Sequence, residues 1–308
     1  MTPPRFIRIT DDRGRDHELR TPPRRIVSLV PSDTYSLVRL GAADRIVGRT
    51  RYCVAPDEAL ASVPEVGGTK DADIDKIAGL KPDLIIANQE ENSRTDILKL
   101  DALGLRVLVS FPQTVSAGLA HLARLARALG EPRGAEPARG AIAAAYHAFQ
   151  EASALTGKAN PVRVFCPIWM DPLMTIHGAT FISDVLALVG AENVFAQRER
   201  RYPLAADMGG APPLPAERVA NRDVRYPRVT LDEIVAHQPE LVILPDEPHP
   251  FTEADARVFR GLDIPAAKTG NVVFCDGKDL MWYGARSTEG LGRLKALVDA
   301  ARGGSLDC

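Results

Sequence analysis

The side chains of this chain best suited to hold a ligand are its few large aromatic rings. The two tryptophans, Trp169 and Trp282, each follow a predicted strand in a polar, turn-rich segment. A flat aromatic face can stack on a planar ligand through offset ring contacts and apolar burial. Because Tyr283, Gly284 and Arg286 give its surroundings the character of a loop, we expect Trp282 to be exposed to a ligand, with Tyr283 beside it as a further ligand-binding residue. The alternative is that both tryptophans pack in the core.

Four further residues extend this candidate ligand-binding set. Arg286 could pair through its planar guanidinium with a carboxylate or a phosphate, although an ordinary surface arginine near the start of the last helix would look the same. Tyr52 follows the second predicted strand. Ser32 and Asp33 lie in the turn after the first predicted strand, where they would face a ligand or, equally well, cap the following helix.

The chain carries none of the short motifs that mark common enzyme sites. It contains no G-x-S-x-G, no H-E-x-x-H and no G-x-G-x-x-G after a strand, and residues 67–70 (GGTK) lack the spacing of a phosphate loop. The six histidines show no metal-ligand spacing, and we expect His121 and His147 on a solvated helix face. The sequence therefore predicts a protein that is not an enzyme and has no cofactor and no dedicated metal site.

The four cysteines form no C-x-x-C pair. Cys166 and Cys275 lie in apolar, strand-like stretches. In a chain of this size with so few cysteines, we expect small buried hydrophobic side chains rather than disulfides.

The bulk composition is ordinary for a globular protein. The chain has 308 residues, 45% hydrophobic and 25% charged, with a formal net charge of −2. No basic excess suggests nucleic-acid binding, and no run of 18 apolar residues predicts a membrane span. The first residues lack the apolar core of a signal peptide. We therefore expect either a cytoplasmic protein or one whose export signal is absent from this sequence.

The order of apolar runs and breakers predicts how these residues are positioned. Residues 5–20 alternate around a turn and predict a β-hairpin, and residues 25–110 alternate between strands and helices. Residues 114–155 are rich in Ala, Leu and Arg at helical spacing, with one interruption at 130–134. This stretch predicts a shorter helix followed by a long one.

Alternation resumes at Pro161 and ends in a helix from about Thr288 to Ala301. We predict an α/β fold of two lobes, each with a short, mostly parallel sheet flanked by helices, bridged by one long helix. The expected boundaries are an N-terminal lobe at 1–113, a bridging helical segment at 114–157 and a C-terminal lobe at 158–308.

Two pairs of segments echo each other across the predicted bridge. Residues 75–86 and 232–243 both run from an acid through a helix to a proline, a second acid and an apolar strand. Residues 40–46 and 189–194 both pass from a helix ending at glycine into a strand. These echoes predict two similar lobes, with a ligand held between them at the carboxyl ends of the strands.

Residues 197–228 interrupt the second lobe. They carry many Arg and Pro residues and predict a long irregular excursion, either a surface loop or a partial lid.

Short segments from about residue 24 to residue 300 follow one another in a familiar order. They are Arg25–Thr34, Tyr52-Cys53, Val66–Asp71, Lys81–Ile86, Glu90–Asn92, Trp169–Pro172, Thr180–Ile182, Gly190–Phe195 and Trp282–Arg286. The ordered set resembles the helical-backbone metal-receptor family, the substrate-binding proteins of cobalamin, iron-siderophore and haem importers.

The resemblance implies a ligand held between two lobes and delivered to a permease of the ABC type. Asp75 and Asp232 are similar in position to the surface acids with which that family contacts permease arginines, although the family more often has Glu there. Acids favoured at helix N-termini by the helix dipole would explain both residues without a partner.

The resemblance also implies the class of ligand. We expect a bulky metal chelate, cobalamin first and a siderophore or haem second, with the corrin or porphyrin ring against the aromatic residues. His177 and His249, near strand ends, could meet the metal of such a chelate. A monomer in the periplasm or at the cell surface is expected. The alternative is a cytoplasmic cobamide- or metal-chelate-handling protein, for storage or salvage, without a transporter.

Overall fold

The structure of the chain is a computed structural model. It describes residues 5–130, 136–220 and 222–303. The chain divides into two compact units, which we call unit 1 (Met1–His147 with Trp282–Thr288) and unit 2 (Ala148–Met281 with Glu289–Cys308). Unit 1 is therefore built from two stretches of sequence that are far apart in the chain.

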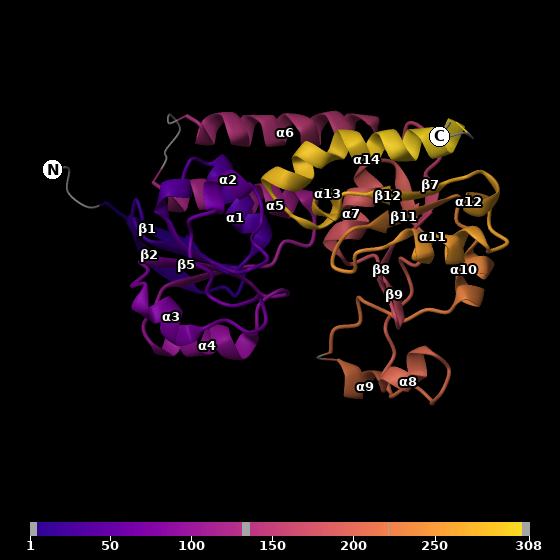
Figure 1. The fold of residues 1–308 in the computed structure, drawn as a ribbon, viewed down its shortest axis with the longest axis horizontal. Helices are drawn as coiled ribbons and strands as arrows, with labels where there is room; N and C mark the ends of the chain where they lie inside the picture. Colours follow the sequence, from indigo (N-terminus) through magenta and orange to yellow (C-terminus); the bar gives the residue numbers. More distant parts are fainter. Residues whose placement is uncertain (1–4, 131–135, 221, 304–308) are drawn as a thin grey trace. The chain divides into compact units, whose positions relative to one another are not determined.

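A four-stranded parallel sheet forms the middle of unit 1 (Figure 1). Its spatial order is β4 (Ile46–Arg49), β3 (Ile26–Ser28), β5 (Leu84–Asn88) and β6 (Val107–Ser110). Every residue of β5 and β6 is buried, as expected for parallel strands that are covered on both faces. Apolar residues of this sheet pack against helices in one core, which includes Val27, Ile77, Ile85, Leu100 and Val107.

The other elements of unit 1 follow the predicted alternation. Its helices up to residue 128 are α1 (Pro31–Arg39), the short 3₁₀ helix η1 (Ala43–Arg45), α2 (Asp57–Leu60), α3 (Ile74–Gly79), α4 (Arg94–Ala102) and α5 (Val115–Ala128). The predicted N-terminal hairpin is confirmed as β1 (Arg5–Thr10) paired with β2 (Asp16–Thr21). Its turn is attached to the sheet, because the backbone N–H of Asp12 donates to the carbonyl of Val109 at 3.0 Å.

Unit 2 contains a second four-stranded parallel sheet. Its order is β10 (Ala191–Asn193), β7 (Val162–Phe165), β11 (Leu241–Pro245) and β12 (Val272–Cys275). The helices are α7 (Phe181–Leu188), α8 (Leu204–Asp207), α9 (Ala216–Val219), α10 (Leu231–His237), α11 (Glu253–Arg260), α12 (Pro265–Lys268) and α13 (Gly277–Met281). Buried side chains from sheet and helices share one core, including Phe165, Phe195, Ile234, Val242 and Phe259.

The two sheets confirm the internal repeat, because both place their strands in the chain order second, first, third, fourth. A backbone detail supports it. Among the described residues, the only non-glycine residues with positive φ are Lys81 (49°) and Gln238 (45°). Each stands directly before the proline that precedes the third strand, and a left-handed residue there ends the helix sharply. The predicted α/β fold with two similar lobes is thus correct.

Two long helices contain residues of both units. The predicted long helix is confirmed as α6 (Ala138–Leu155). The last helix, α14, runs over Ala285–Gly303 and begins three residues earlier than the predicted Thr288. Its first turn belongs to unit 1, whereas the sequence had assigned the whole of residues 158–308 to the second lobe. Among the described helices, none combines the length and the apolar composition that crossing a membrane requires.

Within residues 197–220 and 222–228, the excursion contains only the two short helices α8 and α9, which agrees with the prediction of irregular structure. The end of the excursion is hydrogen-bonded to a hairpin formed by β8 (Pro167–Met170) and β9 (Leu173–Thr175). The backbone N–H of Val229 donates to Leu173 and that of Thr175 donates to Pro227, both at 3.0 Å. Figure 1 shows this hairpin reaching from the sheet of unit 2 toward α8 and α9.

Candidate functional site

The carboxyl edge of the unit 1 sheet carries a cluster of buried polar side chains. Ser28, Asn88 and Ser110 are the last residues of β3, β5 and β6, and none is more than 3% exposed. Parallel strands bring their carboxyl ends to one edge of a sheet, so these side chains lie together by topology. Buried polar groups must find hydrogen-bond partners, and two segments distant in sequence supply them.

Asp33, on α1, is the first of these partners and does not cap its helix. The helix begins at Pro31, with Val30 at the N-cap position and no side-chain cap, because proline is well suited to the first helical position. The interpretation of Ser32 or Asp33 as the N-cap is therefore wrong. The Asp33 carboxylate instead lies 2.9 Å from Nε2 of His121 and 2.9 Å from the hydroxyl of Tyr283.

Tyr283 is the second partner, and its hydroxyl is fully occupied. It donates to Asp33 and accepts from the Asn88 amide at 3.1 Å and from the Ser110 hydroxyl at 2.8 Å. Desolvation raises the pKa of Tyr283 well above its ordinary value, and the charges of Asp33 and Glu91 raise it further. The phenol is therefore held neutral, as a hydrogen-bond donor.

His121 of α5 completes this buried group, which was missed from sequence. Only 1% of it is exposed, so the expectation of a solvated helix face is wrong for this residue. A carboxylate only accepts hydrogen bonds, so Nε2 must donate to Asp33. Nδ1 is then a buried nitrogen with no hydrogen-bond partner among the described residues. The histidine spacing in the sequence gave no signal of this pairing, because the partner is 88 positions away.

Trp282 is buried at 4% exposure, so the expectation of an exposed ring is wrong. The segment Trp282–Thr288 folds into unit 1 and carries the indole with it. The Trp282 ring meets the ring of Tyr35 edge-on at a centroid distance of 6.3 Å. The half-buried Arg286 lies over that same tyrosine, with its guanidinium carbon 6.0 Å from the ring centroid.

Tyr52 is the predicted residue that unit 1 leaves most open. Its exposed fraction is 53%, and it follows β4. The guanidinium of Arg51 lies 5.3 Å from its ring centroid, and that arginine is held by Asp71 at 2.6 Å. The adjacent Cys53 is buried, so neighbouring side chains alternate between solvent and core.

Trp169 is the corresponding open ring of unit 2. It lies on β8, directly after the carboxyl end of β7, and is 41% exposed. Its indole N–H donates to the carbonyl of Asp171 at 2.9 Å, which fixes the plane of the ring. The His249 ring lies 5.5 Å away, and Phe251 lies 4.6 Å beyond that histidine. The sequence indicated His249 as a strand-end residue but gave no sign of this cluster, which joins β8 to the loop between β11 and α11.

Asp75 and Asp232 occupy equivalent places in the two units. Each is the second residue of its helix, α3 or α10, and each is exposed. The N-cap residues are Asp73 and Thr230, whose side chains accept a backbone N–H three residues on. The caps satisfy the helix ends, so the two aspartates are not needed for that purpose.

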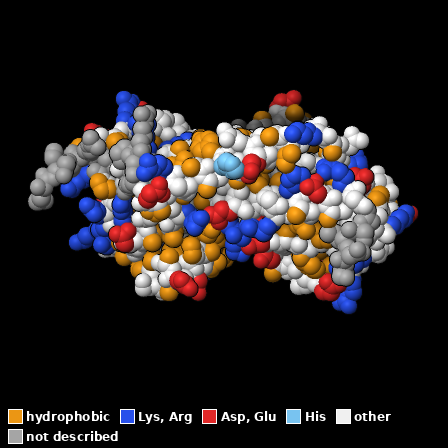
Figure 2. Space-filling view, turned by 90° about the horizontal axis from the view of Figure 1, so that it is seen from above, with side chains coloured by type: hydrophobic (Ala, Val, Ile, Leu, Met, Phe, Trp, Pro, Cys, Tyr) orange, Lys and Arg blue, Asp and Glu red, His pale blue; other side chains and the backbone are white. Residues whose placement is uncertain are grey.

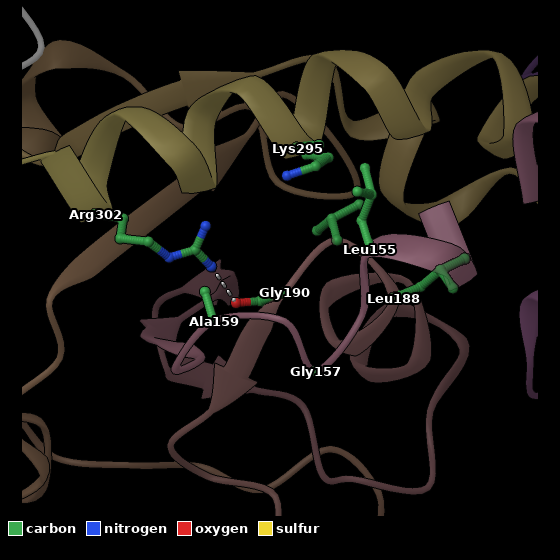
Figure 3. A pocket seen from close by; sticks show the side chains of 8 residues that line it. Leu155, Gly157, Ala159, Leu188, Gly190, Lys295 and Arg302 are labelled. Carbon is green, nitrogen blue, oxygen red and sulfur yellow. Dashed lines mark hydrogen bonds between the residues drawn. The ribbon is translucent and has the colours of Figure 1, made fainter. Parts of the chain in front are cut away.

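A small pocket in unit 2 offers a different set of side chains (Figure 3). Leu155 and Leu188 line it on one side, and Lys295 and Arg302 of α14 on the other. Both cations share one carboxylate, because each contacts Asp299 at 2.6 Å. Arg302 also donates to the carbonyl of Gly190. None of the predicted site residues lines this pocket, and its cations are engaged in holding α14 in place.

The described residues show no group of three or more His, Cys, Asp or Glu side chains placed to hold a metal ion. Cys53, Cys166 and Cys275 are free thiols. Burial raises the pKa of the Cys166 thiol to about 12, which keeps it a protonated, inert hydrophobic group. The interpretation of Cys166 as a buried hydrophobe is confirmed, while Cys275 is only partly buried.

The face of the molecule seen in Figure 2 has no single charge sign. Figure 2 shows acidic and basic side chains interspersed over the visible face, with hydrophobic side chains between them. A mixed surface of this kind produces no strong long-range field, so any selection of a ligand must come from local groups.

Two α/β units, each with a four-stranded parallel sheet in the same strand order, are the architecture of two-lobed binding proteins. The chain belongs to the periplasmic binding protein family, whose sequence profile matches residues 26–278. It is 25% identical over 228 residues to a vitamin B12-binding protein of Photorhabdus laumondii, covering 74% of this chain and 73% of that protein.

Solved structures agree in fold. The periplasmic vitamin B12 binding protein BtuF of Vibrio cholerae superposes with a TM-score of 0.72 at 22% identity, covering 92% of this chain and 99% of that one. The periplasmic heme-binding protein RhuT from Roseiflexus sp. RS-1 gives a TM-score of 0.71 at 20% identity, covering 90% and 99%. The fold is therefore shared by proteins named for different ligands.

Proposed function

We propose that this chain is the substrate-binding protein of an ABC-type importer and that it binds a bulky metal chelate reversibly, cobalamin first and a siderophore or haem second. Membership of the periplasmic binding protein family supports the role of a receptor rather than an enzyme. The names of its relatives, which include vitamin B12-binding and haem-binding proteins, support the class of ligand.

The observation that carries this proposal is the pair of exposed and immobilised rings, Tyr52 and Trp169. Tyr52 follows the carboxyl end of β4 and lies against the Arg51 guanidinium, and Trp169 follows that of β7 and donates from its indole to the carbonyl of Asp171. A ring fixed before binding loses little freedom on contact, so its stacking free energy is retained as affinity. Planar macrocycles are the ligands that such faces suit best.

The remaining predicted ligand-binding residues take supporting roles in this proposal. Ser32, Asp33, Trp282 and Tyr283 are buried and would hold the loops at the carboxyl edge of unit 1. Arg286 is half-buried over an aromatic ring and remains a candidate partner for an acidic ligand group.

We further propose that Asp75 and Asp232 dock this protein on basic residues of its permease. Their exposure and their equivalent positions in the repeat support the proposal, since two similar surfaces can meet two permease subunits in the same way.

Equilibrium dialysis of the purified protein against cyanocobalamin, haem and a ferric siderophore, followed by visible absorbance, tests the ligand class. We expect one chelate to be retained near one per protein. Tyr52→Ala and Trp169→Ala should each weaken its retention by about tenfold, because each removes a stacking face. The matched control is Tyr146→Ala, which removes an equally exposed ring from α6. Retention of no chelate by the wild type would contradict the proposal.

The docking proposal needs a second measurement. The double variant Asp75→Asn/Asp232→Asn should bind the chelate normally. In proteoliposomes, however, it should no longer stimulate transport of the chelate by the permease. Asp57→Asn is the control, since Asp57 is also an exposed acid in the first turn of a short helix but lies outside the repeat. Unchanged transport with the double variant would exclude these residues as the docking contacts.

A further inference from the structure

The excursion at residues 197–228 is chemically unlike the rest of the chain. It contains seven arginines against four carboxylates, a formal charge of +3, whereas the whole chain carries −2. Six of these arginines lie before or after its two short helices rather than within them. This local excess of positive charge differs from the otherwise mixed surface, and the groups around the arginines show how far it is balanced.

Two of the arginines meet at one tyrosine. The guanidinium carbon of Arg222 lies 4.8 Å from the ring centroid of Tyr202, and that of Arg200 lies 5.4 Å from the same centroid. Two like charges around one ring repel each other, and their attraction to the ring offsets part of that cost. An anion accepting hydrogen bonds from both guanidinium groups would convert the repulsion into binding free energy.

The nearby carboxylate, Asp223, is paired with a different arginine, although the charge of Arg200 also contributes to lowering the pKa of Asp223. Asp223 is engaged by Arg225, which donates from Nε at 2.9 Å and from a terminal nitrogen at 2.7 Å. Among the described residues, no carboxylate lies within ion-pair distance of the exposed Arg222. The Nε of Arg200 is buried and has no hydrogen-bond partner among the same residues. Hydrogen-bonding capacity thus remains on both guanidinium groups.

The backbone around this tyrosine is held in place. The Tyr202 hydroxyl donates to the carbonyl of Asp223 at 2.8 Å, and the Tyr202 carbonyl accepts from Leu214 at 2.7 Å. The N–H of Arg200 donates to the carbonyl of Val224 at 2.7 Å. These hydrogen bonds join three segments of the excursion, at residues 200–202, 214 and 223–224. The backbone that carries the two arginines is therefore positioned before any ligand binds.

The base of the excursion is fixed to unit 2 as well. Arg198 contacts Asp207 at 3.2 Å and Glu233 of α10 at 3.0 Å, and the Asp207 side chain is fully buried. The end of the excursion lies beside β9, and β9 pairs with β8, the strand that carries Trp169. The segment that carries the arginine pair is therefore joined through backbone hydrogen bonds to the hairpin that carries the exposed Trp169 indole.

We propose that Arg200 and Arg222, held around Tyr202, form an oxyanion-binding surface that takes a carboxylate or phosphate group on the small-molecule ligand of this protein. This inference rests on the proposed function, since it assigns a chemical feature to the same ligand. A membrane surface is a poorer occupant, because attraction to anionic lipid requires a cluster of four to eight mobile cations. Two guanidinium groups on one ring are too few for such a surface and suit a small anionic group.

The test compares chelates with and without their acidic groups. Haem is paired with its dimethyl ester, which lacks free carboxylates, and cyanocobalamin is paired with dicyanocobinamide, which lacks the phosphate together with the rest of the nucleotide. For whichever chelate is retained in dialysis, we expect the wild type to prefer the acidic member by about ten- to a hundredfold. Arg200→Gln and Arg222→Gln should each abolish most of that preference while binding of the uncharged member stays the same.

Arg218→Gln is the matched control, because Arg218 lies exposed on α9 of the same excursion and is not stacked on Tyr202. It should retain the full preference. Equal retention of both members of a pair by the wild type would overturn the inference and leave the proposed function intact. A preference for the acidic member that survives in Arg200→Gln and Arg222→Gln would also overturn the inference, since these arginines would then only stabilise the excursion.

Failure of the proposed function has a different signature, namely that neither pair of chelates is retained. The surface is then tested by calorimetric titration with inorganic pyrophosphate. Heat of binding in the wild type that is lost in Arg222→Gln but kept in Arg218→Gln supports an oxyanion surface. The absence of heat in the wild type overturns it.

Discussion

The hydroxyl of Tyr283 donates a hydrogen bond to the carboxylate of Asp33 at 2.9 Å, although 250 positions separate the two residues in the chain. Both belong to unit 1, at the carboxyl edge of its sheet. The contact attaches the start of α14 to α1, and through Ser110 and Asn88 to the ends of two strands. One phenol therefore connects the last segment of the chain to the first sheet.

Replacing Tyr283 with Phe should lower the stability of unit 1. The change removes the donor to Asp33 and an acceptor of the Asn88 amide, while the Ser110 hydroxyl keeps the Ala87 carbonyl at 3.3 Å. Unsatisfied buried groups of this kind cost about 1–3 kcal/mol, which should appear as a lower midpoint in urea unfolding followed by circular dichroism. Tyr146→Phe, at an exposed tyrosine, is the control. An unchanged midpoint for Tyr283→Phe would mean that the network contributes nothing to stability.

The same tyrosine predicts a loss of stability at high pH. Desolvation first, and then the charges of Asp33 and Glu91, raise the pKa of Tyr283 in the folded state. The unfolded state therefore loses this proton first, at a pKa of about 10, so the stabilisation is complete below that pH and is lost as the pH rises above it. The buried thiols act in the same direction. Thermal unfolding from pH 8 to 11 should show a steeper decline in the wild type than in Tyr283→Phe, and parallel declines would refute the assignment.

Asp207 should be the most sensitive position of the excursion. Its side chain is fully buried, contacts Arg198 at 3.2 Å and accepts backbone N–H groups from Arg201 and Arg228. Removing one partner of a buried ion pair costs about 3–5 kcal/mol, because the other charge stays buried. Asp207→Ala should therefore lower the unfolding midpoint strongly, whereas Asp263→Asn, at an exposed pair with Lys268, should not. Limited proteolysis should show cleavage within 197–228 in Asp207→Ala alone.

The two tryptophans should differ sharply in their accessibility to a quencher. Trp169 is 41% exposed and Trp282 is 4% exposed. Acrylamide should therefore quench the emission of Trp282→Phe, which retains only Trp169, several times more strongly than that of Trp169→Phe, because quenching requires collision with the ring. Addition of the retained chelate should reduce the quenching of Trp169 and leave that of Trp282 unchanged. Equal quenching of the two variants would contradict the burial of Trp282.

The order of strands and helices could be predicted because the signals for it are local. Proline and glycine positions, apolar runs and helical spacing lie within a few residues of the elements they define. The match between residues 75–86 and 232–243 predicted two similar units, and their sheets indeed share one strand order. Tyr52 and Trp169 could be named from their positions after strands, and both are exposed.

The partners of buried polar residues could not be predicted in this way. His121 looks like any polar residue on a helix, and Trp282 like any ring in a loop, until the chain returns and places Trp282–Thr288 in unit 1. Likewise, Arg200 and Arg222 are 22 positions apart in an irregular segment, and only its folding brings both to Tyr202. Periodicity thus determined the units of this protein. Which side chains meet at their edges was decided by tertiary structure, because such contacts depend on the path of the whole chain and leave no local pattern.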